Sequence, residues 1–285
     1  MKKEEEILSI SNLSLHYKLS RGLFKPTKLV KAVDKISFSL FKGETLGIVG
    51  ESGSGKSSIC RLLLKLIKKT SGSINWFNED IYKLKHSQIK SFRKSVQIIF
   101  QDPYGSLDPR MTIGKIISEP LEIFRKDLKK QEKEILVIKS MIDVGLSSDL
   151  FNRYPHELSG GQCQRVGIAR SLINKPSVLI CDEPVSALDL SIQAQILELL
   201  KDLKTKYKLT VIFVSHDLSI IRSFCDRVIV LKNGNIIENK KTNDLFNNPE
   251  NTYTKKLIAS VPSPCLLYTS PSPRDLSTSR MPSSA

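Results

Sequence analysis

The sequence lacks the features that would place a protein across a membrane. It contains no run of about 18 apolar residues, so we expect no helix that spans a bilayer. The first six residues, MKKEEE, have no apolar core of the kind found in a signal peptide. A hydrophobic content of 40% suits a globular protein. Because the sequence has neither a membrane span nor a signal peptide, we expect the chain to stay in the cytoplasm.

Cysteine is sparse, and its spacing is not that of a metal site or a disulfide framework. The five cysteines form no C-x-x-C pair, which is the spacing typical of such sites. Cys60 and Cys181 lie in apolar stretches, and we expect both in the core.

The basic residues form no stripe interleaved with aromatic residues, although they outnumber the acidic ones. The chain has 44 Lys and Arg against 29 Asp and Glu, which gives a net charge of +15. Scattered lysines favour a solvated surface over a groove for nucleic acid, and we expect no nucleic-acid partner. A weak attraction to anionic lipid stays open.

The most informative segment that is present spans residues 50–57. It reads GESGSGKS and fits the phosphate-loop pattern G-x-x-x-x-G-K-[ST]. An apolar strand pattern over 45–49 precedes it, and a helical pattern over 58–67 follows. The alternative is a glycine-rich turn that binds nothing, but the flanking strand and helix favour a phosphate cradle. We expect Lys56 to reach the β- and γ-phosphates and Ser57 to hold Mg²⁺.

Strand and helix patterns divide the rest of the chain. Strands separated by turns at 34–35 and 42–43 fill the first 49 residues, a helical insertion occupies about 104–173, and strands then alternate with helices. This alternation predicts a mostly parallel α/β core. We expect strands at 7–10, 13–17, 30–33, 36–40, 46–49, 73–77, 96–100, 178–182, 209–214 and 227–231. We expect helices at 58–67, 113–124, 131–144, 163–172, 191–203 and 218–224.

The apolar strand 178–182 ends in two carboxylates, Asp182 and Glu183, at the end where ligands bind in such sheets. We expect Asp182 to hold Mg²⁺ and Glu183 to polarise the attacking water as a general base. His216 ends the next strand, from which it can bond the γ-phosphate or that water. Ordinary surface carboxylates are the alternative, which the preceding phosphate loop makes less attractive.

A second glycine-rich motif, LSGGQ at 158–162, opens another helix. Ser159 is a natural N-cap, and the helix N-terminus makes a second anion site. Because one nucleotide does not need two such sites, we expect this loop to clasp a nucleotide held by another subunit. A plain helix start is the alternative. Residues 186–189, SALD, could cross the same contact between subunits.

Two further residues complete the set. Gln101 follows a strand and could touch Mg²⁺ and report its presence to the helical insertion. Tyr17 could stack on the adenine, with Phe24 as a rival and simple strand packing as the alternative.

Taken in order, these motifs resemble those of the ATP-binding cassette (ABC) superfamily, over about residues 5–264. Finer features are similar to the ATPase subunits of oligopeptide and dipeptide importers. They are RGLFK at 21–25, KAVD at 31–34, PHELSGGQCQR at 155–165, CDEPVSALDLS at 181–191 and LFNNP at 245–249. The resemblance implies a P-loop NTPase core with a mostly parallel sheet, an antiparallel β-subdomain and an inserted α-helical subdomain.

The same resemblance implies ATP and Mg²⁺ as cofactors and a role for each candidate. Glu183 is the catalytic base and His216 the switch. Ser57, Gln101 and Asp182 serve the metal. The nucleotide contacts are Tyr17, Gly50, Glu51, Ser52, Gly53, Ser54, Gly55, Lys56, Ser57, Ser58 and Gln101, with Ser159, Gly160, Gly161 and Gln162 acting from the partner subunit.

The implied function is ATP hydrolysis that energises peptide import at the cytoplasmic face of the cell membrane. The implied partners are a second ABC ATPase, in a heterodimer rather than a homodimer, two transmembrane permease subunits and, indirectly, an extracytoplasmic peptide-binding protein. Nickel or glutathione import stays open, because the cargo is chosen by other subunits. A soluble ABC ATPase for DNA or translation is less favoured, because the chain has one cassette and no heptads or zinc spacing.

The end of the sequence departs from the family. Residues 242–264 resemble the start of the importers' C-terminal extension, which we expect to be truncated, and 251–254 read NTYT where the family has HPYT. Residues 265–285 are rich in Pro and Ser and resemble a translated DNA sequencing adapter. We expect this tail not to be native.

Overall fold

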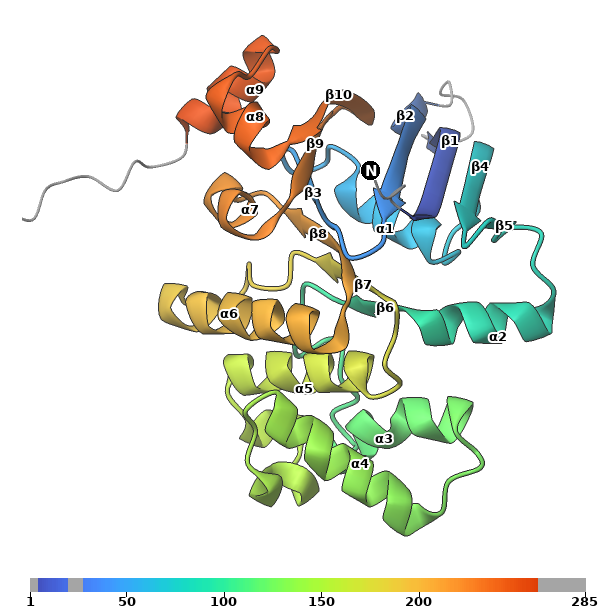
Figure 1. The fold of residues 1–285 in the computed structure, drawn as a ribbon, viewed down its shortest axis with the longest axis vertical. Helices are drawn as coiled ribbons and strands as arrows, with labels where there is room; N and C mark the ends of the chain where they lie inside the picture. The colour runs from blue at the N-terminus through green and yellow to red at the C-terminus, as the bar shows by residue number, and fades with distance from the viewer. Residues whose placement is uncertain (1–4, 20–27, 261–285) are drawn as a thin grey trace, which may run out of the picture.

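The computed structural model describes residues 5–19 and 28–260, which form two sheets and the helices around them (Figure 1). The predicted α/β class is confirmed, with a mostly parallel sheet, an antiparallel sheet and an inserted group of helices. Phe24, the stretch 21–25 and the tail 265–285 lie outside the described residues. No helix among those described is long and apolar enough to cross a membrane.

The first sheet has four antiparallel strands in the order β2-β1-β4-β5. Its strands are β1 (Glu6–Leu19), β2 (Lys28–Phe41), β4 (Ser71–Trp76) and β5 (Glu79–Asp80). The turn expected at 34–35 is wrong, because Lys35 is a positive-φ residue inside the continuous strand β2. Serine hydroxyls explain how the strands continue through irregularities: Ser14 accepts from the Lys35 N–H and Ser37 from the Asn12 N–H.

The second sheet has six strands in the order β10-β9-β3-β8-β7-β6, all parallel except β10 at one edge. They are β3 (Thr45–Val49), β6 (Val96–Ile99), β7 (Val178–Asp182), β8 (Thr210–Ser215), β9 (Arg227–Lys232) and β10 (Asn235–Lys241). The strands β3, β7 and β8 are buried along their whole length. Continuous apolar runs are therefore required there, as the sequence predicted.

The helices that follow these strands cover the parallel sheet, and an inserted group extends away from it (Figure 1). They are α1 (Lys56–Leu63), α2 (His86–Ser95), α3 (Ile113–Phe124), α4 (Lys130–Asp143), α5 (Gly160–Leu172), α6 (Leu190–Tyr207), α7 (Leu218–Phe224), α8 (Thr242–Asn247) and α9 (Thr252–Ala259), with short 3₁₀ turns at Ser148–Asn152 and Pro155–Glu157. The inserted helices α3, α4 and α5 pack on one another.

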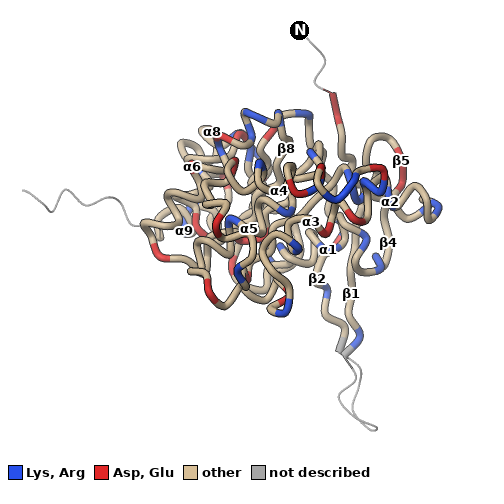
Figure 2. The backbone as a smooth tube through the Cα atoms, turned by 90° about the horizontal axis from the view of Figure 1, so that it is seen from below, with Lys and Arg blue, Asp and Glu red and all other residues tan. Residues whose placement is uncertain are grey.

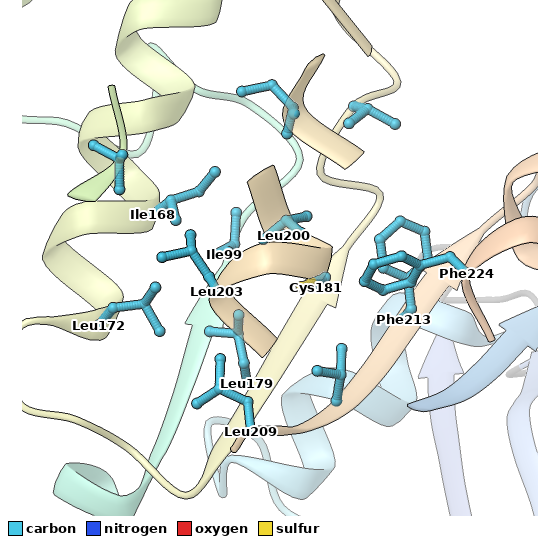
Figure 3. Packing of buried hydrophobic residues seen from close by; sticks show 14 of the residues in the cluster. Ile99, Ile168, Leu172, Leu179, Cys181, Leu200, Leu203, Leu209, Phe213 and Phe224 are labelled. Carbon is cyan, nitrogen blue, oxygen red and sulfur yellow. The ribbon is translucent and has the colours of Figure 1, made fainter. Parts of the chain in front are cut away.

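Alternate residues of the central strands enter two different hydrophobic clusters. On β8, Val211 and Phe213 join the cluster that includes the inserted helices, whereas Ile212 and Val214 join the cluster under the antiparallel sheet. Side chains alternate between the faces of a strand, so the parallel sheet is covered on both sides. Figure 3 shows part of the first cluster, with Cys181 among its aliphatic residues.

Charged residues of both signs are distributed over the described part of the chain. Figure 2 shows basic and acidic residues interleaved along many elements. Several basic residues pair with acids, among them Lys206 with Asp143 and Arg227 with Glu44.

We expect Phe213→Ala to destabilise the protein. Phe213 is fully buried, and its ring centroid lies 4.8 Å from that of Phe224. Loss of this ring should lower the free energy of unfolding by about 3–5 kcal/mol, measured by urea denaturation. Ile135→Ala, at an exposed position, serves as control and should change the free energy of unfolding by about 0.5 kcal/mol or less. Equal effects of the two variants would contradict the packing argument.

Candidate functional site

The loop between β3 and α1 has a backbone that only glycine accommodates at its two ends. Gly50 has φ +154°, and a Cβ there would lie 2.3 Å from the Leu231 carbonyl oxygen. Gly55 has φ +109°, and a Cβ there would lie 2.3 Å from the Ala32 carbonyl oxygen. The loop leads directly into α1, which has no acidic residue in its first turn and no side-chain cap. Its free backbone N–H groups can therefore meet an anion.

Lys56 is the buried cation of this loop. Its ammonium donates to the carbonyl oxygens of Gly50 at 2.7 Å and Glu51 at 3.0 Å. It also lies 3.6 Å from a carboxylate oxygen of Glu183, and only 5% of the Lys56 side chain is exposed. The loop carbonyls and this carboxylate compensate a charge that would otherwise be costly to bury.

Ser57 and Asp182 lie beside each other at the ends of α1 and β7. The Ser57 hydroxyl donates to the Asp182 carboxylate at 3.1 Å. Burial raises the pKa of Asp182, the hydrogen bond from Ser57 lowers it, and nearby Glu183 raises it. A nearby cation would stabilise the charged form of this buried carboxylate. Hydroxyl and carboxylate oxygens are also the ligand atoms that suit Mg²⁺. The donor set therefore fits the expected metal.

Glu183 sits in a strained turn that directs its carboxylate into the site. Its φ is +50°, a left-handed conformation uncommon for a residue other than glycine, and its N–H donates to the Val214 carbonyl at 3.0 Å. The carboxylate accepts from the Gln101 amide at 3.4 Å and from His216 Nδ1 at 3.1 Å. Since a carboxylate only accepts, the imidazole carries its proton on Nδ1 in this contact.

These residues surround a cavity of about 510 Å³. Tyr17, which is 40% exposed, lines it together with Gln101 and Glu183. From the loop and α1 the lining residues are Ser52, Gly53, Gly55, Lys56, Ser57 and Ser58. The other expected residues do not line the cavity but lie next to residues of the site. Lys56 bonds to Gly50 and Glu51, Ser57 to Asp182, and Glu183 to His216, while Ser54 lies beside Gly50. A larger cavity of about 720 Å³ lies near Glu44 and Asp226, before β3 and β9, and contains none of the expected site residues.

The second glycine-rich motif does not join this cavity. Ser159 is exposed and caps α5: its hydroxyl accepts from the Gln162 N–H at 3.3 Å, while the Gln162 side chain accepts from the Ser159 N–H at 2.9 Å. In Figure 1, α5 lies with the inserted helices, away from α1. The candidate residues therefore form two separate groups on one chain.

The motif at 158–162 instead packs on the segment after β7. A Cβ at Gly160 would lie 3.5 Å from Leu188, and one at Gly161 would lie 2.7 Å from Ile192. Leu190, between them, is 83% exposed. The segments 158–162 and 186–189, which the sequence predicts at a subunit contact, are thus neighbours, with the exposed apolar Leu190 beside them.

Several residues of the cavity were missed from the sequence. Lys31, Ala32 and Asn233 also line it. Asn233 belongs to the β9–β10 turn, where the Gly234 N–H donates to the Ser54 carbonyl at 3.0 Å. The Asn-Gly dipeptide was an available signal for a hairpin, but its contact with the phosphate loop depends on tertiary structure.

A phosphate-binding loop with a buried lysine lies after β3, and it faces carboxylates at the end of β7, the next parallel strand but one in the sheet. This arrangement defines the site as that of a P-loop nucleoside triphosphatase. The comparisons are more specific. A family model described as "ABC transporter" matches residues 33–186, and the chain belongs to this family, whose ATP-binding subunits are ATPases.

The chain is similar to curated transport proteins over most of its length. It is 45% identical to the oligopeptide transport ATP-binding protein OppF of Salmonella typhimurium, over 93% of this chain and 80% of that protein. It is 42% identical to the dipeptide transport ATP-binding protein DppF of Escherichia coli, over 91% of this chain and 77% of that protein.

Solved structures agree on the fold. The dimeric ATP-binding cassette MJ0796, in a post-hydrolysis state bound to ADP and Pi, superposes with a TM-score of 0.74 at 29% identity, covering 83% of this chain and 99% of that chain. The cbiO1 protein of Clostridium perfringens gives a TM-score of 0.73 at 30% identity, covering 86% of this chain and 92% of that chain.

We expect Glu183→Gln to slow ATP hydrolysis by at least about 100-fold while ATP binding is retained, because an amide cannot take a proton from the attacking water. Phosphate release and equilibrium ATP binding measure the two effects. Glu198→Gln, an exposed residue of α6, is the matched control and should hydrolyse ATP normally. Unchanged turnover in Glu183→Gln would overturn the assignment of the base.

Proposed function

We propose that this chain is the ATP-hydrolysing subunit of an importer for oligopeptides or dipeptides. The observation that carries the substrate class is the identity of 42–45% with OppF and DppF, two relatives named for peptide transport, over more than nine-tenths of the chain. The same relatives favour peptides over nickel or glutathione and over a role outside transport.

We infer that the complete ATP site forms between two subunits. The loop 50–58 of one subunit would hold the phosphates, and Ser159, Gly160, Gly161 and Gln162 of the partner would close on them. The separation of these two groups within one chain supports this arrangement, as does the dimeric cassette among the similar structures. We favour a heterodimer with a second, related ATPase.

Within the site, the chain's own residues would position ATP and move one proton. Lys56 would exchange its loop carbonyls for phosphate oxygens, and Tyr17 would stack on the adenine. Glu183 would take the proton of the attacking water, with His216 orienting that carboxylate through its 3.1 Å contact. Mg²⁺, held by Ser57, Asp182 and Gln101, would supply charge stabilisation to the phosphates.

The helical insertion would couple this site to two permease subunits. A cavity of about 320 Å³ lies between β6 and α3, and its lining combines apolar residues, among them Phe100, Ile123 and Phe124, with polar and charged ones. Gln101, directly after Phe100, contacts Glu183. We propose that permease loops dock in this cavity, which places the subunit peripherally on the cytoplasmic face of the cell membrane and makes the extracytoplasmic peptide-binding protein an indirect partner.

The proposed domain is one cassette over residues 5–264, with the helical subdomain at about 104–173 and the start of the C-terminal extension at 242–264. We keep the proposal that the tail 265–285 is not native.

We expect Ser159→Arg to block closure of the ATPase dimer while an isolated subunit still binds ATP. Ser159 is exposed and outside the cavity, so a large cation there leaves the phosphate loop intact but obstructs a partner subunit. ATP-dependent dimer formation with the partner ATPase, in a Glu183→Gln background and measured by light scattering, reports closure. Ser147→Arg replaces another exposed capping serine, and we expect this variant to form the closed dimer normally. Dimer closure of the Ser159→Arg variant would refute the proposed contact of Ser159 with the partner's nucleotide.

We expect ATP-dependent uptake of labelled peptides when the chain is reconstituted in proteoliposomes with its permease, its partner ATPase and the binding protein. Lys56→Ala should abolish uptake, because the phosphates lose their buried cation. The same vesicles are tested with nickel and with glutathione. Uptake of either of these without peptide uptake would contradict the peptide assignment.

A further inference from the structure

The C-terminal helix α9 contacts the phosphate loop directly. The Glu51 backbone N–H donates to the hydroxyl oxygen of Tyr253, with 3.2 Å between nitrogen and oxygen. Only 8% of Tyr253 is exposed. Glu51 is the second residue of the loop, so a segment far along the chain satisfies one of the loop's backbone donors.

Tyr253 is held in place from several sides. The Lys232 ammonium lies 4.6 Å from the centre of its ring. Asn251 caps α9 by accepting from the Tyr253 N–H at 2.8 Å, and Glu238 on β10 accepts from the Asn251 N–H. Burial raises the pKa of Tyr253, so its phenol stays neutral. The start of α9 is therefore anchored to the β9–β10 hairpin.

Glu51 joins this anchor to the buried lysine. While its N–H donates to Tyr253, its carbonyl oxygen accepts from Lys56 Nζ at 3.0 Å and from the Ser54 N–H at 3.1 Å. Displacement of this one residue would move both the first turn of the loop and the position of the Lys56 ammonium.

We propose that Tyr253 is a positioning residue for ATP, which fixes the first turn of the phosphate loop and so sets nucleotide affinity. This inference rests on the proposed nucleotide site. Fixing the loop before ATP arrives reduces the ordering that binding would otherwise cost. We assign the effect to binding, because the phenol bonds to the Glu51 N–H, whereas among the described residues the side-chain partners of Glu183 are Gln101, His216 and Lys56.

The test is Tyr253→Phe, which keeps the ring and removes the hydrogen bond. We expect the Kd for a fluorescent ATP analogue with Mg²⁺, and the KM for ATP, to rise about fivefold, the effect of one hydrogen bond. The kcat should stay within about twofold, as for a loss of uniform binding. Hydrogen exchange of the Glu51 amide should accelerate in the nucleotide-free protein.

Tyr207→Phe is the matched control, because it removes a phenol hydrogen bond to Asp143 that is remote from the site. A merely structural role would lower the melting temperature in both variants and leave the Kd unchanged in both. Asn251→Ala, which loosens the start of α9 but keeps the phenol, should raise the Kd in the same direction.

The outcomes separate the two proposals. If the unaltered protein fails to bind Mg²⁺-ATP, the proposed site is wrong. If it binds, and Tyr253→Phe shows the same Kd and the same Glu51 exchange, the positioning role is wrong while the proposed site stands.

Discussion

The parallel pairing of β3, β8 and β7 is the constraint on which the site depends. Val49 pairs with Ser215, and Val214 pairs with Asp182, so the three strands end at one edge. The residues that follow these ends are the phosphate loop, His216 and Glu183. A slip in this register would separate Lys56 from Glu183 and Ser57 from Asp182. The two hydrophobic clusters that cover the sheet on both faces therefore do more than stabilise the fold. They hold the strand register that brings the phosphate loop, Glu183 and His216 to one edge.

Burial at this edge makes the charges interdependent. Lys56 is almost fully buried and relies on two loop carbonyls and on Glu183. Within residues 5–19 and 28–260, the Asp182 carboxylate has one hydrogen-bond partner, Ser57, and its pKa is raised by burial. Such groups are costly without partners. An incoming phosphate would place negative charge beside Lys56, and its cation would place positive charge beside Asp182. A nucleotide with its metal would therefore compensate both buried groups, whereas either alone would compensate one.

Much of the fold and the local part of the site could be predicted, because they are encoded by short-range patterns. The helices Ile113–Phe124 and Leu218–Phe224 and the strand Val178–Asp182 lie where the sequence predicts. The helices α2, α8 and α9 and the strand β10 were missed; they are short or lie at an edge, and they carry few buried residues. Asn233 and Lys31 could not be assigned to the cavity, because hairpin and sheet contacts place them there rather than any local pattern.

The departure of residues 251–254 from the family pattern now has a physical account. Asn251 and Thr252 are the N-cap and first residue of α9, positions where Asn is a strong cap and the family's Pro is well suited. The two residues that match the pattern, Tyr253 and Thr254, are the buried ones. The substitutions therefore exchange one way of starting a helix for another and leave the contact with Glu51 in place. Any change that moves α9 would reach Lys56 through that contact, so the proposed ATP site depends on this helix as well as on the loop.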